Sequence, residues 1–93
     1  MSIAVLSTNR PRLARRARLE WDAVRERHVL LEPEGVLVLN QTGAIILGLC
    51  DGERTVDEIV EELRKRYNRV AGDEVHDFLS RLVAKRLVEL GDE

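Results

Sequence analysis

The sequence predicts an α+β domain in which a three-stranded antiparallel sheet is followed by three helices. Apolar residues alternate with charged ones in the first part of the chain, and after residue 40 they follow a helical period instead. The chain has 93 residues, 44% of them hydrophobic and 34% charged, which suits one folded domain. We expect this domain over residues 12–93, after a flexible N-terminal segment over residues 1–11 that shows no sustained period and ends at Arg10-Pro11.

Three short segments have the pattern of strands. Residues 13–21 place apolar side chains between Arg and Glu at the period of two that marks a half-buried strand. Residues 27–32 and 36–39 follow, and Glu32-Pro33-Glu34-Gly35 between them has Pro and Gly at the positions that a β-turn favours. The order predicts an antiparallel meander.

The first two helices are marked by capping residues. Thr42, or Asn40 instead, can cap a helix that carries Ile45 and Ile46 and stops at Asp51-Gly52. Thr55-Val56-Asp57-Glu58 is a capping box, and it predicts a helix that ends near Tyr67-Asn68.

A third helix is expected to begin at Gly72 or Asp73. Acidic residues in its first turn favour the positive end of the helix dipole. Its apolar stripe consists of Val75, Phe78, Leu79, Leu82 and Val83, with Leu87 at its edge. This stripe is wide, because Phe78 and Val83 lie about 140° apart on a helical wheel of 100° per residue.

The net charge of −2 hides an asymmetry along the chain. Residues 1–27 contain seven Arg and three acids, whereas residues 28–93 contain eight basic and fourteen acidic residues. The arginines could form a phosphate-binding arm, but apolar residues are interleaved with them, which favours a solvated strand face. No run is long and apolar enough for a membrane span or a signal peptide, so we expect a cytoplasmic protein without membrane contact.

No set of residues with the parts of an active site is visible. His28, His76 and Cys50 are scattered without a shared spacing, and no glycine-rich phosphate loop is present. Cys50 lies in an apolar run, which predicts a buried structural thiol. We therefore expect a protein that is not an enzyme, with no catalytic residue, no metal site and no cofactor.

The segment at residues 36–39 has the properties of an unprotected sheet edge. It contains no charge and no proline, although natural edge strands are usually protected by one or the other. Such an edge can accept a partner's extended peptide as an additional strand. A helix of the same domain, or a second copy of the chain in a homodimer, could equally cover it.

The third helix could form the other wall of a peptide groove. Phe78 and Leu82 would supply apolar walls, and Arg81, Lys85 and Arg86 would supply charge at the rim; a stripe that spans two neighbouring helices is the alternative. The predicted peptide-binding residues are Val36, Leu37, Val38, Leu39, Val75, Phe78, Arg81, Leu82 and Lys85.

A DNA-binding winged helix is a further hypothesis. Three helices with a β-hairpin fit that fold, and Arg81, Lys85 and Arg86 would be the recognition set. Acids at positions 73, 74 and 77 would then face phosphates, and the chain is acidic beyond residue 27, so we do not expect nucleic acid as a partner.

Several motifs resemble those of the PqqD family, the small proteins of pyrroloquinoline quinone biosynthesis. They are Arg10-Pro11-Arg12-Leu13, Leu39-Asn40-Gln41-Thr42-Gly43 and the segment Leu49-Cys50-Asp51-Gly52-Glu53-Arg54-Thr55-Val56-Asp57-Glu58-Ile59-Val60. The resemblance covers residues 10 to 90, and related domains serve other peptide-modifying pathways.

The resemblance implies a small winged-helix-like fold and a peptide chaperone. Such a protein binds the precursor peptide PqqA and delivers it to the radical S-adenosylmethionine enzyme PqqE, which carries the cofactors. In related recognition elements the leader peptide lies as a strand between the third strand and the third helix. In this chain those elements are residues 36–39 and the helix that bears Phe78 and Leu82.

Overall fold

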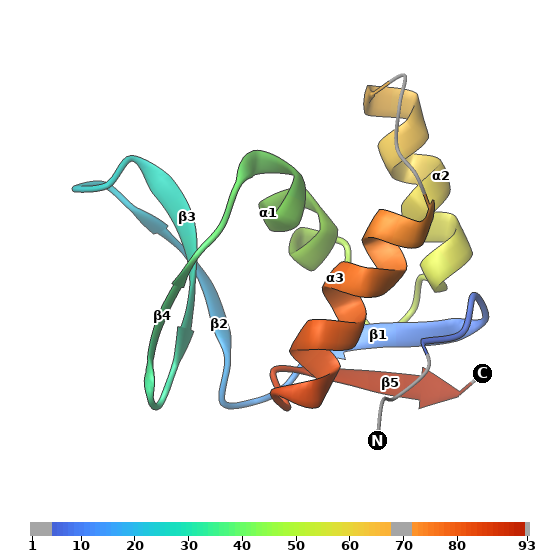
Figure 1. Cartoon of the computed structure of the whole chain (residues 1–93), viewed down its shortest axis with the longest axis horizontal. Helices are drawn as coiled ribbons and strands as arrows, with labels where there is room; N and C mark the ends of the chain where they lie inside the picture. The colour runs from blue at the N-terminus through green and yellow to red at the C-terminus, as the bar shows by residue number, and fades with distance from the viewer. Residues whose placement is uncertain (1–4, 68–71, 93) are drawn as a thin grey trace.

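The computed structural model describes residues 5–67 and 72–92. Its elements in order are β1 (Asn9–Leu13), β2 (Arg18–Asp22), β3 (Arg27–Glu32), β4 (Gly35–Val38), α1 (Gln41–Gly48), α2 (Val56–Arg66), α3 (Gly72–Ala84) and β5 (Val88–Asp92). The strands β2, β3 and β4 form one sheet, and β1 pairs with β5 in a second. Figure 1 shows the three-stranded sheet at one end of the molecule and the two-stranded sheet beside α2 and α3. The predicted α+β fold is confirmed, with β1 and β5 as additions.

The three-stranded sheet has the predicted meander order and turn. Glu32 pairs with Gly35, so Pro33 and Glu34 form the two-residue connection between β3 and β4. The core-facing side of the sheet carries Leu30, which is fully buried, and its β4 partner Leu37. Burial of this face fixes the register, because a shift of one residue would turn the leucines away from the core.

The single strand predicted over residues 13–21 is wrong. A turn separates β1 from β2, and in it the Ala17 amide donates to the Ala14 carbonyl at 3.0 Å. Both alanines are buried, whereas Arg15 and Arg16 between them are exposed. Leu13 and Leu19 are in phase at a period of two, so the sequence suggested one strand, although the two residues belong to different sheets.

Strand β5 is the element that the sequence did not predict. It pairs antiparallel with β1, from Asn9 opposite Asp92 to Leu13 opposite Val88. Regular structure therefore begins at Asn9, inside the segment expected to be flexible, and Pro11 is buried in β1. A proline is tolerated here because β1 is an edge strand. Residues 1–4 of that segment lie outside the described residues.

The helix caps follow the sequence closely. Asn40, and not Thr42, caps α1, since its side-chain oxygen accepts from the Gly43 amide at 2.7 Å. The capping box of α2 is confirmed: the Glu58 amide donates to the Thr55 hydroxyl at 3.2 Å, and the Thr55 amide donates to the Glu58 carboxylate at 2.8 Å. Helix α3 begins at Gly72, as predicted. Helix α1 ends at Gly48, ahead of the predicted stop at Asp51-Gly52, and Asn68 lies outside the described residues.

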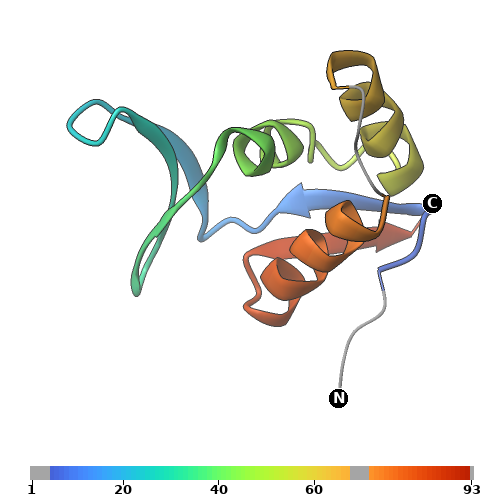
Figure 2. The same ribbon diagram turned by 45° about the horizontal axis from the view of Figure 1, so that its top comes forward.

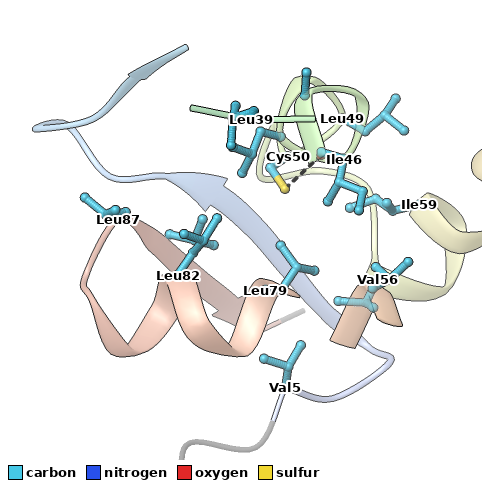
Figure 3. Close-up of a cluster of buried hydrophobic side chains, with 14 of the residues drawn as sticks. Val5, Leu39, Ile46, Leu49, Cys50, Val56, Ile59, Leu79, Leu82 and Leu87 are labelled. Atoms are coloured by element: carbon cyan, nitrogen blue, oxygen red, sulfur yellow. Dashed lines mark hydrogen bonds between the residues drawn. The ribbon is translucent and has the colours of Figure 1, made fainter. Parts of the chain in front are cut away.

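The core lies between the three helices and the two-stranded sheet, and it extends to the larger sheet through contacts of α1 with β2 and β3. Figure 3 shows side chains from α1, α2 and α3 converging there, together with Leu39 and Val5. Turned by 45°, the molecule shows the three-stranded sheet projecting away from this core (Figure 2). The core residues with no exposed surface include Leu30, Val56, Ile59, Leu63, Leu79 and Leu87.

Cys50 is a buried thiol of this core, as predicted. It donates a hydrogen bond to the Ile46 carbonyl at 3.2 Å (Figure 3). Burial, with a smaller contribution from the charge of the neighbouring Asp51, raises the pKa of the thiol from 9.0 to about 12. A thiol that keeps its proton is a poor nucleophile.

We expect this thiol to lower the stability of the protein at high pH. The unfolded thiol ionises above pH 9, whereas the folded thiol stays protonated to about pH 12. The free energy of unfolding should therefore fall by about 1.4 kcal/mol per pH unit in this window. Urea unfolding at pH 8 to 11 measures this loss, and a Cys50→Ala variant with the same slope as the wild type would contradict the assignment.

Candidate functional site

The outer edge of β4 carries unpaired main-chain groups. Among the described residues, β4 pairs with β3 alone. The Leu39 amide donates to the His28 carbonyl, and hydrogen-bonded pairs alternate along an antiparallel ladder, so Leu37 also pairs inward with Leu30. The N–H and C=O groups of Val36 and Val38 therefore point outward, as the predicted free edge requires.

A groove of about 510 Å³ lies between this edge and α3. Its lining includes most of the predicted peptide-binding residues, namely Leu37, Val38, Leu39, Phe78, Arg81, Leu82 and Lys85. Val36 lies on the same edge outside the lining and is 49% exposed. The groove thus joins two segments that are about forty residues apart in the sequence.

A second cavity of about 390 Å³ continues the groove between α1 and α3. Val75, which is buried, lines this cavity and not the groove. Asn40, Phe78 and Arg81 line both spaces. The sequence prediction missed Asn40 and Tyr67; Asn40 belongs to the Asn-x-Thr-Gly motif, which could have indicated it.

The groove has charge at its rim. Arg81 lies in the last turn of α3 and Lys85 directly follows the helix. Both are exposed, and neither forms an ion pair among residues 5–67 and 72–92. Glu74 and Asp77 line the second cavity, so the sign of charge changes along α3. A segment bound here would be favoured if it placed a carboxylate beside Arg81 and Lys85.

Phe78 is held in place by a close contact with α1. A Cβ atom added to Gly43 would lie 3.2 Å from the Phe78 ring and 3.1 Å from the Asn40 side-chain oxygen. Glycine at position 43 therefore lets the α1 cap and the ring approach each other. The motif Asn40-Gln41-Thr42-Gly43 shapes the junction between the two cavities.

We expect Gly43→Ala to destabilise the protein by about 1–2 kcal/mol, because the methyl group overpacks this junction. Gly48→Ala is the matched control in the same helix, since nothing lies within 4 Å of its added Cβ. It should be neutral, or stabilising by about 0.5–1 kcal/mol, as expected for alanine in place of helical glycine. Thermal unfolding of both variants measures the difference, and equal stabilities would contradict the role of Gly43.

The Asp51-Gly52 motif has a structural role. The Asp51 carboxylate accepts hydrogen bonds from the amides of Arg54 and Glu53, both at 2.9 Å, and these bonds lower its pKa. Gly52 has a φ of +81°, a conformation that glycine adopts without strain, and its amide donates to the Pro11 carbonyl at 2.9 Å. The motif fastens the α1–α2 connection to β1.

The two histidines contact different parts of the structure. His28 contacts the Trp21 ring edge to face at 5.0 Å, and His76 Nδ1 lies 2.9 Å from the Val5 carbonyl oxygen. Over the part of the chain that the structure describes, no three His, Cys, Asp or Glu side chains are placed to hold a metal. No helix in the same part has the length and apolar character needed to cross a bilayer.

Comparison with protein families and curated relatives gives consistent matches. Residues 27–88 match the family model described as "Coenzyme PQQ synthesis protein D (PqqD)". The chain is 47% identical over 64 residues to the PqqA binding protein of Klebsiella pneumoniae (strain 342), covering 67% of this chain and 70% of that protein. It is 38% identical over 85 residues to the PqqA binding protein of Stutzerimonas stutzeri (strain A1501), covering 89% and 92%.

Two solved structures share the fold. The solution structure of the PqqD truncation of Methylobacterium extorquens PqqCD, described as a functional and stand-alone recognition element, matches with a TM-score of 0.73 and 36% identity. That match covers 92% of this chain and 95% of the other. The heterocyclase TruD matches with a TM-score of 0.64 and 26% identity, over 88% of this chain and 11% of TruD.

Proposed function

Since the chain belongs to the PqqD family, we propose that it binds the precursor peptide PqqA as an added strand of its larger sheet and presents it to the radical S-adenosylmethionine enzyme PqqE. The bound segment pairs with the outward main-chain groups of Val36 and Val38. Its alternate side chains enter the groove between β4 and α3.

The groove beside an unpaired strand edge is the observation that carries this proposal. A peptide lying there gains main-chain hydrogen bonds from β4 and apolar contacts from Phe78 and Leu82. Relatives of this chain are named for PqqA binding, which is consistent with an extended ligand. The peptide loses conformational entropy when it is ordered as a strand, so moderate affinity is expected.

The chain's own contribution is binding and orientation, without a reaction step. It raises the local concentration of the peptide at the enzyme, and we propose that it acts in the cytoplasm. The relative from Methylobacterium extorquens is described as a recognition element, and in TruD a domain of this fold forms part of a heterocyclase chain. Both comparisons support a domain that brings a peptide to an enzyme.

Titration of isotope-labelled protein with synthetic PqqA tests the proposal. Amide shifts should centre on β4 and on residues 75–86 of the chain, and they should saturate with peptide concentration. Saturable shifts confined to β1, β5 and α2 would overturn strand addition at β4.

The same samples test the two alternatives. A DNA-binding winged helix would bind random duplex DNA with an affinity that falls steeply with salt. The exposed acids Asp73, Glu74 and Asp77 on α3 oppose that function. A homodimer paired through β4 would show a concentration-dependent mass in sedimentation and would exclude the peptide.

A further inference from the structure

A separate cavity, called the arginine cavity below, is lined mainly by arginines. It has a volume of about 590 Å³ and is formed by β1, the turn that follows it and the turn between α3 and β5. Arg12, Arg15, Arg16 and Arg86 line it, with Glu89 as its acid. Arg12 is paired with Glu89 at 3.1 Å, whereas Arg15, Arg16 and Arg86 are exposed and have no side-chain partner among the described residues.

Arg86 stands at a backbone position that normally holds glycine. The Leu87 amide donates to the Leu82 carbonyl and the Arg86 amide donates to the Val83 carbonyl, both at 2.9 Å, which is the hydrogen-bond pattern of a Schellman motif. Arg86 itself has a φ of +63°, in the left-handed region where a side chain is unfavourable. An arginine here costs stability, and its guanidinium joins the cavity, so its presence points to use of the side chain.

The arginine cavity lies beside the peptide groove without overlapping it. Lys85 lines the groove and its neighbour Arg86 lines the arginine cavity, and the two spaces share no residue. The Ala14 amide donates to the Leu87 carbonyl at 2.9 Å, which fixes the β1–β2 turn against the end of α3 (Figure 1). Both sites can therefore be occupied together.

We propose that the arginine cavity docks an acidic surface of the enzyme that receives the peptide. The inference rests on the proposed presentation of the peptide, which requires a second surface that leaves the groove open. Three unpaired guanidinium groups in one concavity suit carboxylates, which they can bind through paired hydrogen bonds. An enzyme held there lies next to the Lys85 end of the groove.

The observations favour a protein over a nucleic acid as the partner. The positive charge is gathered in one compact cavity and does not continue as a stripe that could follow a nucleic-acid backbone. The chain has a net charge of −2, and the exposed face of α3 carries acids in its N-terminal half. A nucleic acid would meet these acids beyond the cavity.

Binding of PqqE and of PqqA, measured separately by calorimetry, tests the inference with two variants. Arg86→Gly relieves the strained backbone, so its melting temperature should be unchanged or higher, while its affinity for PqqE should fall about fivefold. Arg15→Glu combined with Arg16→Glu should weaken PqqE binding about tenfold, and less at high salt. Arg27→Gln, at the start of β3 and outside the lining of the cavity, is the control for lost charge and should bind PqqE normally.

The two affinities separate failure of this inference from failure of the proposed function. PqqE binding that is unchanged in both cavity variants would overturn the docking surface, even with PqqA binding intact. Arginine-dependent binding of a 20-base-pair DNA duplex would also overturn it. If the wild type binds PqqE but not PqqA, strand capture fails, and the cavity variants still decide the docking surface.

Discussion

Replacing Val38 with proline is expected to weaken peptide binding about thirtyfold. The variant loses the outward N–H of β4, whose net hydrogen bond contributes about 1 kcal/mol, and it leaves a peptide carbonyl unpaired at a further cost of about 1 kcal/mol. Val38 is 44% exposed and its N–H bonds no residue of β3, so the domain should remain folded. Calorimetric titration with PqqA measures the change.

Two further proline variants are controls for this experiment. Leu37 pairs inward with Leu30, so Leu37→Pro should break the β3–β4 ladder and destabilise the fold. On the opposite edge of the sheet, Trp21 also directs its amide outward and is 56% exposed. Trp21→Pro should leave PqqA affinity within twofold of the wild type. Equal losses in Val38→Pro and Trp21→Pro would show that the peptide does not pair with β4.

Reversing both charges at the groove rim is expected to reduce peptide affinity about tenfold at low salt. In Arg81→Glu combined with Lys85→Glu, two attractive contacts with a peptide carboxylate become repulsive, each worth up to about 1 kcal/mol for exposed groups. The loss should shrink above about 0.3 M salt, where screening shortens the range of the field. Both side chains are exposed and unpaired among the described residues, so the free energy of unfolding should change by less than about 1 kcal/mol.

The control for net charge uses arginines away from the groove. Arg27→Glu combined with Arg66→Glu makes the same change in net charge on β3 and at the end of α2. Peptide affinity should then stay near the wild-type value. A loss equal to that of the rim variant would mean that only the overall charge matters, and that Arg81 and Lys85 have no local role.

The sequence predicted the free edge of β4 because the signals for it are local. Residues 36–39 lack charge and proline, and the turn at Pro33 and Gly35 makes this strand the last of its meander. Pairing with β3 alone, within the described part of the chain, follows from that order. The prediction that α3 lies beside this edge depended on the family resemblance. The period of a wide apolar stripe does not tell which neighbouring element the stripe contacts.

The missed features depend on contacts between distant residues. Strand β5 is short, so the sequence did not show where it begins. The turn after α3 places Arg86 at a positive φ, where glycine is usual, so the sequence did not show where the helix ends. The break between β1 and β2 could not be seen in the sequence because Leu13 and Ala17, on either side of it, lie in phase with Leu19 and Trp21 at a period of two. The arginine cavity also joins residues more than seventy positions apart, and the sequence showed only a basic N-terminal region.

The pairing of β1 with β5 affects the order in which the protein can fold during translation. Asn9 pairs with Asp92 and Leu13 pairs with Val88, so the complete ladder cannot form until residue 92 has been synthesised. Closing such a long loop is slow relative to forming the hairpin of β3 and β4. During translation the hairpin of β3 and β4 can therefore form first. The nascent chain then exposes the unpaired outer edge of β4 before β1 pairs with β5.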